Sequence, residues 1–119
     1  MDFEAKIAEL GLLIPKPAKP AGSYKPCVIV DNIAYISGQG PLLEDGSFAK
    51  GKVGADVDLE TAQNHARLCG LAILSALKNE IGSINKVDQL IKLTGFVNCI
   101  ESFTQQPLVI NGCSNMMKD

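Results

Sequence analysis

The sequence lacks several features that common classes of protein require. It has no tryptophan, aromatic residues make up 5% of its 119 residues, and its one histidine and one arginine are His65 and Arg67. A lone histidine cannot form a two-histidine metal site within one chain. A single arginine among scattered lysines leaves no basic stripe for a nucleic-acid backbone. Apolar runs such as Leu10–Ile14 fall far short of the ~20 residues that cross a bilayer. We therefore expect neither nucleic acid nor a membrane as a partner, and no metal site.

The composition that remains fits one soluble globular domain. Apolar residues make up 46% of the chain, charged residues make up 20%, and the formal net charge is −2. Acidic residues stand near the N-terminus, where a secretory signal would be basic, so we predict a cytoplasmic protein. The four cysteines form no CxxC or Cys/His pairing, which predicts buried, reduced thiols.

Turn and cap residues divide the chain into predicted elements. Residues 2–10 are predicted to form a short helix that acts as an amphipathic lid, and a proline-rich arm follows it up to residue 22. Residues 23–119 form the predicted domain. It opens with strands at 27–30 and 33–36, joined by a hairpin turn at Asp31 and Asn32, two residue types that tolerate positive φ.

Two helices and a third strand complete the prediction. Asp58 is the expected N-cap of a long helix that ends at Ile81, with small residues on an inward face that suits packing on a sheet. The expected inward face consists of Ala62, Ala66, Cys69 or Gly70, Ile73 and Leu77. Alternation over 87–100 predicts a strand, and Pro107 opens a second helix. This order of elements is typical of an α+β fold.

Few residues offer chemistry by themselves. The stretch Ser37–Pro41 carries two glycines at a strand end, where exposed N–H groups can cradle a carboxylate or phosphate, although an ordinary strand end shows the same pattern. His65 has no partner in its sequence environment and is interpreted as structural. Asp56, Asp58 and Glu60 are interpreted as the entry to the long helix rather than a cation loop.

Five segments together resemble the Rid/YjgF family, the reactive intermediate deaminases also known as endoribonuclease L-PSP proteins. These segments occur in the family's order and are Pro20–Tyr24, Ile36–Pro41, Ala62–Ala66, Ile91–Val97 and Val109–Gly112. The resemblance implies a chorismate-mutase-like fold with a mixed β-sheet backed by two helices. It also implies a homotrimer with a pocket at each interface between neighbouring subunits.

The same resemblance implies an activity and a site. Family members hydrolyse enamines and imines of the 2-aminoacrylate type to a keto acid and ammonia, and they need no cofactor. The substrate-binding positions correspond to Tyr24, Ser37, Gly38 and Asn111. The family's carboxylate-binding arginine and water-positioning glutamate lie on strands that follow the second helix. We expect these two strands beyond Asp119, which leaves the catalytic residues unassigned and the domain incomplete.

Three alternatives remain open at this stage. The chain can be a non-catalytic protein of the same fold that binds small carboxylates, or an inactive truncated fragment. The older family name suggests a ribonuclease, against which the sequence pI of 5.3 argues. Whichever holds, the ligand expected from the resemblance is a small imine, enamine or carboxylate.

Overall fold

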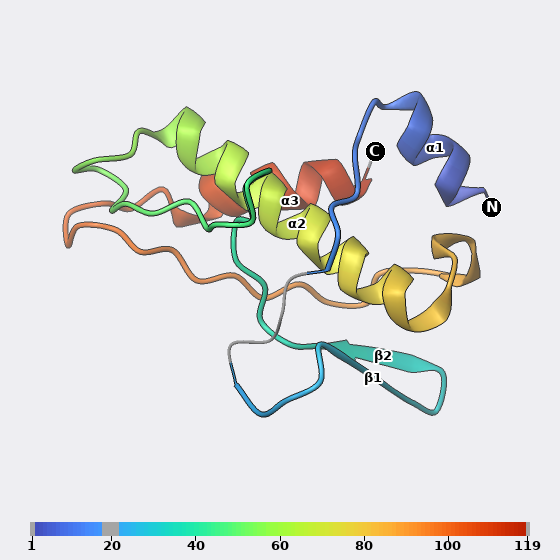
Figure 1. Cartoon of the computed structure of the whole chain (residues 1–119). Helices are drawn as coiled ribbons and strands as arrows, with labels where there is room; N and C mark the ends of the chain where they lie inside the picture. The colour runs from blue at the N-terminus through green and yellow to red at the C-terminus, as the bar shows by residue number, and fades with distance from the viewer. Residues whose placement is uncertain (1, 18–21, 119) are drawn as a thin grey trace. The chain divides into compact units, whose positions relative to one another are not determined.

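The computed structural model describes residues 2–17 and 22–118 (Figure 1). The chain divides into two compact units. The first unit comprises Met1–Gln39 and Leu71–Ile91, and the second comprises Gly40–Gly70 and Lys92–Asp119. Pro20 and Ala21, which begin the first of the five family segments, lie outside the described residues. Among the residues that are described, no helix combines the length and the hydropathy needed to span a bilayer.

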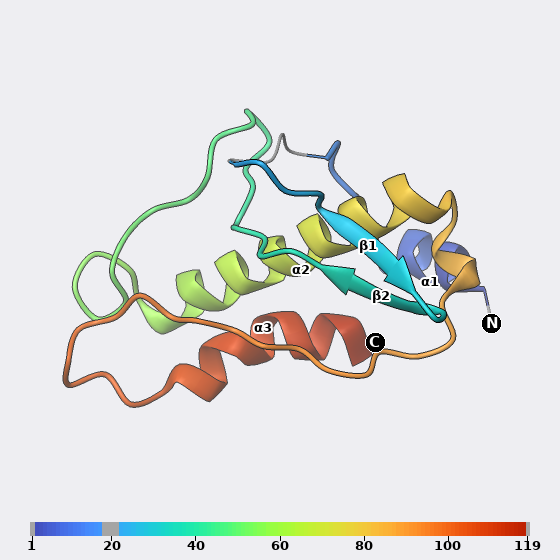
Figure 2. The same cartoon turned by 90° about the horizontal axis from the view of Figure 1, so that it is seen from below.

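The first unit contains the predicted hairpin. Strands β1 (Cys27–Val30) and β2 (Ile33–Ile36) pair antiparallel, with Cys27 opposite Ile36 (Figure 2). Asp31 and Asn32 have φ values of 50° and 64°. Two successive positive φ values are those of a type I′ turn, whose twist matches that of the strands. The predicted turn is confirmed at the predicted residues.

Specific hydrogen bonds hold helix α1 (Phe3–Glu9) in the first unit. Asp2 accepts a hydrogen bond from the Ala5 N–H at 3.0 Å, which confirms the cap at the start of the helix. The Glu4 carboxylate accepts from the Ile84 N–H at 3.1 Å and pairs with Lys78 Nζ at 3.2 Å. The apolar side of α1 packs against a core cluster, and no residue of α1 is itself buried.

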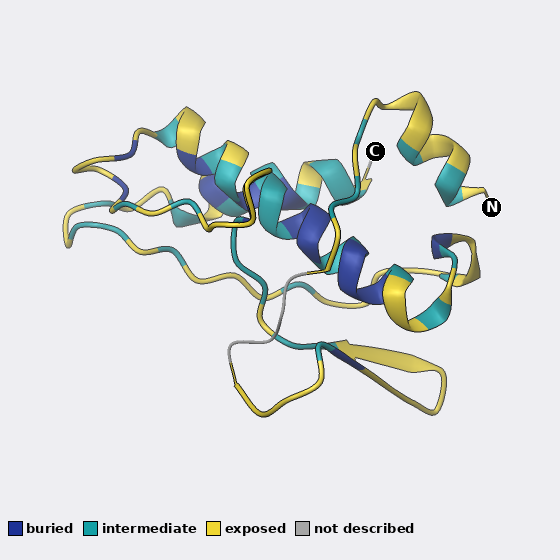
Figure 3. Cartoon of the chain, viewed as in Figure 1, coloured by how far each residue is buried: buried dark blue, intermediate teal, exposed yellow. Residues whose placement is uncertain are grey.

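That cluster is the core of the first unit. Its buried members, Cys27, Leu77 and Ile84, come from β1, from α2 (Leu59–Ile81) and from the 3₁₀ helix η1 (Ile84–Lys86). Phe3 and Ile7 of α1 pack against them. The hairpin contributes little else to the core, since most of it is exposed (Figure 3). Its exposed apolar side chains are Val28, Ile29, Val30, Ile33 and Tyr35.

The second unit is built around the start of α2 and around α3 (Gln106–Lys118). The Asp58 carboxylate accepts from the Thr61 N–H at 2.8 Å, which confirms the predicted N-cap. The core of this unit is a cluster of buried side chains, with Leu93, Val97 and Phe103 among those packed against it. The buried members are Val53, Val57, Ala62, Ala66, Val109 and Cys113.

The small residues of α2 serve a different purpose from the one predicted. In the second unit the neighbour of α2 is α3 rather than a sheet. Gln63 donates a side-chain hydrogen bond to the Leu108 carbonyl oxygen at 3.0 Å, and a methyl group placed on Gly112 would overlap the Gln63 carbonyl. Farther along α2, Leu71, Ala72 and Ala76 are buried, whereas the predicted inward residue Ile73 is only partly buried.

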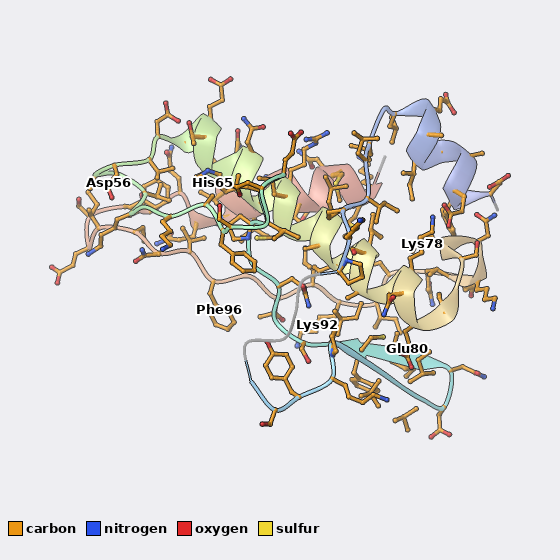
Figure 4. All side chains as sticks on the ribbon, viewed as in Figure 1. Asp56, His65, Lys78, Glu80, Lys92 and Phe96 are labelled. Atoms are coloured by element: carbon orange, nitrogen blue, oxygen red, sulfur yellow. The ribbon has the colours of Figure 1, made fainter. Side chains whose placement is uncertain are left out.

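The strand predicted over 87–100 is not formed. Within the described residues, segment 87–98 has no strand pairing. Backbone pairing with another segment begins where the Val53 N–H donates to the Asn98 carbonyl oxygen at 2.9 Å and the Val53 carbonyl oxygen accepts from the Ile100 N–H at 3.1 Å. A strand needs a neighbouring strand to satisfy its backbone groups, and alternation along one segment cannot supply one. Phe96 is 94% exposed and points away from the ribbon (Figure 4).

Candidate functional site

The predicted strand-end site lies where β2 leaves the hairpin, in the first unit. Ser37 follows the last residue of β2, and its N–H donates to the Pro26 carbonyl oxygen at 2.9 Å. Its hydroxyl donates to the Lys25 carbonyl oxygen at 2.7 Å. Two hydrogen bonds from one residue fix the serine against the chain that enters β1. The hydroxyl oxygen keeps its lone pairs, so it can accept a further hydrogen bond from a ligand or a water molecule.

Gly38 provides the open position beside this serine. It is exposed, and a methyl group added to it would meet no atom within 4 Å. Gln39 bends back so that its side-chain amide donates to the Ser37 carbonyl oxygen at 3.2 Å. Because the Ser37 N–H is already bonded to Pro26, the Gly38 N–H is the backbone donor at this strand end that a ligand can reach. Sequence reasoning had placed Ser37 and Gly38 on an equal footing as backbone donors.

Tyr24 belongs to the same corner of the first unit. It directly precedes Lys25, whose carbonyl oxygen holds the Ser37 hydroxyl, so the chain places Tyr24 and Ser37 close together. Its side chain is 47% exposed. The ring lies beside Gly22, where an added methyl group would be 3.4 Å from Tyr24 Cε1. Three of the four predicted positions therefore share one corner of one unit.

Asn111, the fourth predicted position, lies in the second unit. It stands in the middle of α3 and is partly buried. Its neighbour Gly112 is the position at which α3 approaches the backbone of α2. Helix packing within the second unit therefore fixes the position of Asn111.

None of the four predicted positions is itself a charged residue. The one arginine, Arg67, and the one histidine, His65, both lie on α2, away from either end of the helix. Figure 4 labels His65 on this helix. Lys25 is the cationic residue nearest in sequence to the serine. Across residues 2–17 and 22–118, no three His, Cys, Asp or Glu side chains gather as a metal site of those ligands would require.

Sequence reasoning missed the two residues that hold the serine. Lys25 and Pro26 act through backbone carbonyl oxygens, which any residue type supplies, so no pattern in the sequence marks them. The pairing of Cys27 with Ile36 does imply them once the hairpin register is known. Extending the ladder one residue outward from that pair places Pro26 opposite Ser37.

Comparison with known proteins identifies the family of the chain. The family model described as "YjgF/chorismate mutase-like, putative endoribonuclease" matches residues 4–119. Protein TCP17 of Trypanosoma cruzi is 34% identical over 113 residues, which cover 95% of this chain and 71% of that protein.

Two crystal structures share the fold. A protein from Shewanella oneidensis MR-1, described as a "putative endoribonuclease", matches with a TM-score of 0.92 and 29% identity, over 98% of this chain and 77% of that one. A protein of unknown function from Agrobacterium tumefaciens matches with a TM-score of 0.82 and 42% identity, over 95% of this chain and 68% of that one. The predicted α+β, chorismate-mutase-like fold is thus confirmed, and the chain belongs to the YjgF/chorismate mutase-like family.

Proposed function

We propose that this protein acts in the hydrolysis of reactive enamines and imines of the 2-aminoacrylate type to a keto acid and ammonia. The observation that carries the proposal is the strand end, where a fixed serine hydroxyl and an open Gly38 N–H stand next to the chain that bears Tyr24. Family membership supports the choice of substrate class, because the resemblance that identified the family associates these positions with imine substrates.

The proposed hydrolysis requires few catalytic groups from the protein. Water adds to the imine carbon of 2-iminopropionate, a proton moves to the nitrogen, and the C–N bond breaks to release ammonia and leave a keto acid. Orientation and a positioned water account for most of the acceleration that such a site needs. In this proposal the Gly38 N–H and the Tyr24 hydroxyl hold the substrate and the Ser37 oxygen accepts a hydrogen bond from the water. Asn111, in the second unit, is a substrate-binding position that rests on the family resemblance alone.

A coupled assay tests the proposal. A serine dehydratase generates 2-aminoacrylate, and the appearance of keto acid is followed with and without this protein. We expect acceleration that is reduced by Tyr24→Phe but kept by Tyr35→Phe, a change at the chain's other, more exposed tyrosine. Asn111→Ala should likewise reduce the rate, whereas Asn115→Ala on the same helix should not. Equal rates with and without the protein would refute the activity.

A second candidate is a non-catalytic protein that binds small carboxylates at the same strand end. It is favoured by the kind of groups present there, since a serine hydroxyl and a glycine N–H can bind a carboxylate but do not exchange protons readily at neutral pH. Keto acids that raise the melting temperature without any turnover would select this candidate. Gly38→Ala should abolish that shift in melting temperature, because the added methyl group would occupy the open space beside the Gly38 N–H. It should leave folding intact, because the methyl group meets no protein atom within 4 Å.

Assembly into a homotrimer belongs to the same proposal. The exposed apolar side chains of the hairpin support association, because a two-stranded hairpin is marginally stable without further contacts. Light scattering coupled to size exclusion measures the mass directly. A monomer at micromolar concentration would refute the trimer.

RNA cleavage, which the family description suggests, is tested by incubating the protein with RNA alongside Asn111→Ala.

A further inference from the structure

Sulfur-bearing side chains gather in the second unit, where α2 meets α3. The chain has four cysteines and three methionines. Cys113, Met116 and Met117 stand at positions i, i+3 and i+4 of α3, a spacing that places side chains on one face of a helix. That face is turned toward Gly70 of α2, and Cys69 is the residue before this glycine.

The contacts around Gly70 show how closely these groups converge. A methyl group placed on Gly70 would lie 2.6 Å from Met116 Cε, 2.9 Å from Cys113 Sγ and 3.5 Å from Met117 Cε. Three sulfur-bearing side chains therefore surround one point at which the opposite helix has no side chain. Cys113 is 4% exposed, whereas both methionines are only partly buried, so this cluster lies at the margin of the core.

Cys69 adds a fourth sulfur to the same neighbourhood. Burial raises the pKa of Cys69 to about 11, and the neighbouring Cys113 thiol contributes to this increase. Burial also raises the pKa of Cys113. An electrostatic contribution from Cys113 requires its thiol to be near Cys69, in agreement with the approach of Cys113 Sγ to the adjacent Gly70.

We propose that Cys113, Met116 and Met117 form a binding site for a soft monovalent cation, Cu(I), with Cys69 beside it. Thiolate and thioether sulfurs select Cu(I) over harder ions. Binding breaks the Cys113 S–H bond, forms an S–Cu bond and releases one proton to water, and copper stays in the same oxidation state. One thiolate neutralises one Cu(I), and the two thioethers complete the coordination without adding charge. A neutral complex suits a partly buried position, where an unbalanced charge would be costly.

The flexibility of the ligands fits this assignment. Methionine has three rotatable bonds after its α-carbon, so its sulfur can turn toward an ion without movement of the helix. Because Gly70 has no side chain, the ends of Met116, Cys113 and Met117 can approach the same point beside α2. The partly buried methionines also give an ion a route from solvent.

The test must distinguish ligation from simple packing of sulfur side chains. Leucine matches methionine in volume and fills a core equally well. The double variant Met116→Leu/Met117→Leu thus keeps the packing and removes both thioethers. Cys113→Ala removes the thiolate. Cys27→Ala is the matched control, because Cys27 is a buried cysteine that belongs to the first unit.

The experiment measures Cu(I) affinity of the whole chain under anaerobic conditions, in competition with bathocuproine disulfonate. We expect one equivalent of Cu(I), a weakening of affinity by at least about tenfold in the double leucine variant, and loss of the site in Cys113→Ala. Cys27→Ala should bind as the unmodified chain does. X-ray absorption should show sulfur as the only ligand.

Three results would overturn the proposal: no Cu(I) retained against the competitor, equal affinity in the double leucine variant and the unmodified chain, or a loss of affinity in Cys27→Ala. Circular dichroism of each variant establishes that it is folded before its affinity is compared. Because no turnover is measured, the outcome is independent of the proposed deaminase activity.

Discussion

Replacing Gly112 with alanine tests the close approach of α2 and α3. Inside a helix this substitution normally stabilises a protein by about 1 kcal/mol, because glycine is a poor helix former. At Gly112 the added methyl group would overlap the carbonyl oxygen of Gln63 and would lie 2.8 Å from its carbonyl carbon and 2.9 Å from its Cα. Backbone atoms of a helix cannot rotate away, so α3 would have to move as a whole.

The expected magnitude follows from these two opposing effects. Overpacking in a well-packed core costs about 1–3 kcal/mol, and a rigid backbone obstacle places Gly112→Ala at the upper end of that range. Subtracting the gain in helix propensity leaves a net loss of about 2 kcal/mol in the free energy of unfolding. For a chain of this size, such a loss lowers the melting temperature by roughly 8 °C.

Gly70→Ala is the matched control on the facing helix. Its methyl group would meet Met116 Cε and Cys113 Sγ, which are the ends of side chains rather than backbone. Because the methionine can turn aside, the helix-propensity gain and the local repacking should nearly cancel. Urea unfolding followed by far-ultraviolet circular dichroism measures both variants. If Gly112→Ala is as stable as the unmodified chain, or no less stable than Gly70→Ala, the close approach of the two helices is refuted.

Three further predictions concern single groups. Hydrogen bonding from the Ile84 N–H and pairing with Lys78 lower the pKa of Glu4. The stability that Glu4 contributes is therefore complete above the ordinary carboxyl pKa, and it is lost as the pH falls through the lowered pKa of Glu4. Glu4→Gln should flatten this pH dependence when the melting temperature is measured over an acid titration. Asn32→Ala should lower the free energy of unfolding by about 1–2 kcal/mol in urea, because alanine disfavours the positive φ at this position. Asn32→Gly should not lower it, because glycine adopts a positive φ readily. With its pKa raised to about 11, Cys69 should react with iodoacetamide at neutral pH about a hundredfold more slowly than an ordinary thiol, as mass spectrometry of labelled peptides can measure.

Elements with a local cause could be predicted from the sequence. The hairpin turn needs two residues that tolerate positive φ, and Asp31 and Asn32 are adjacent in the chain. The start of α2 needs a carboxylate that reaches a backbone N–H three residues ahead, and Asp58 supplies it. In both cases the stabilising contact spans only a few residues, so the pattern and its cause lie together in the sequence.

Elements whose cause is distant could not be predicted in the same way. Alternation over 87–100 indicates which side chains would share a face, but not whether another strand is present to accept the hydrogen bonds. The structure joins this segment to Val53 through Asn98 and Ile100, some 45 residues away in the chain, and no periodicity reports such a partner. The partners of α1 could not be predicted for the same reason, because Glu4 bonds to groups near residue 84.

The candidate site shows both situations. Ser37 and Gly38 were recognised because a glycine after a strand is visible in the sequence, whereas the backbone oxygens that fix the serine are not. Of the two, only Gly38 keeps its N–H for a ligand, a distinction that follows from the hairpin register.

The packing of Gly112 determines the position of Asn111, the candidate site residue of the second unit. Gly112 is required because α3 approaches the Gln63 backbone at that turn, and this contact sets how deeply α3 lies against α2. Asn111 is the preceding residue on the same turn, so the position of its amide depends on the depth of that contact. A side chain larger than hydrogen at 112 would displace Asn111 together with the helix. Helix packing therefore explains why residue 112 is a glycine. The same packing fixes the position of Asn111, whatever ligand Asn111 binds.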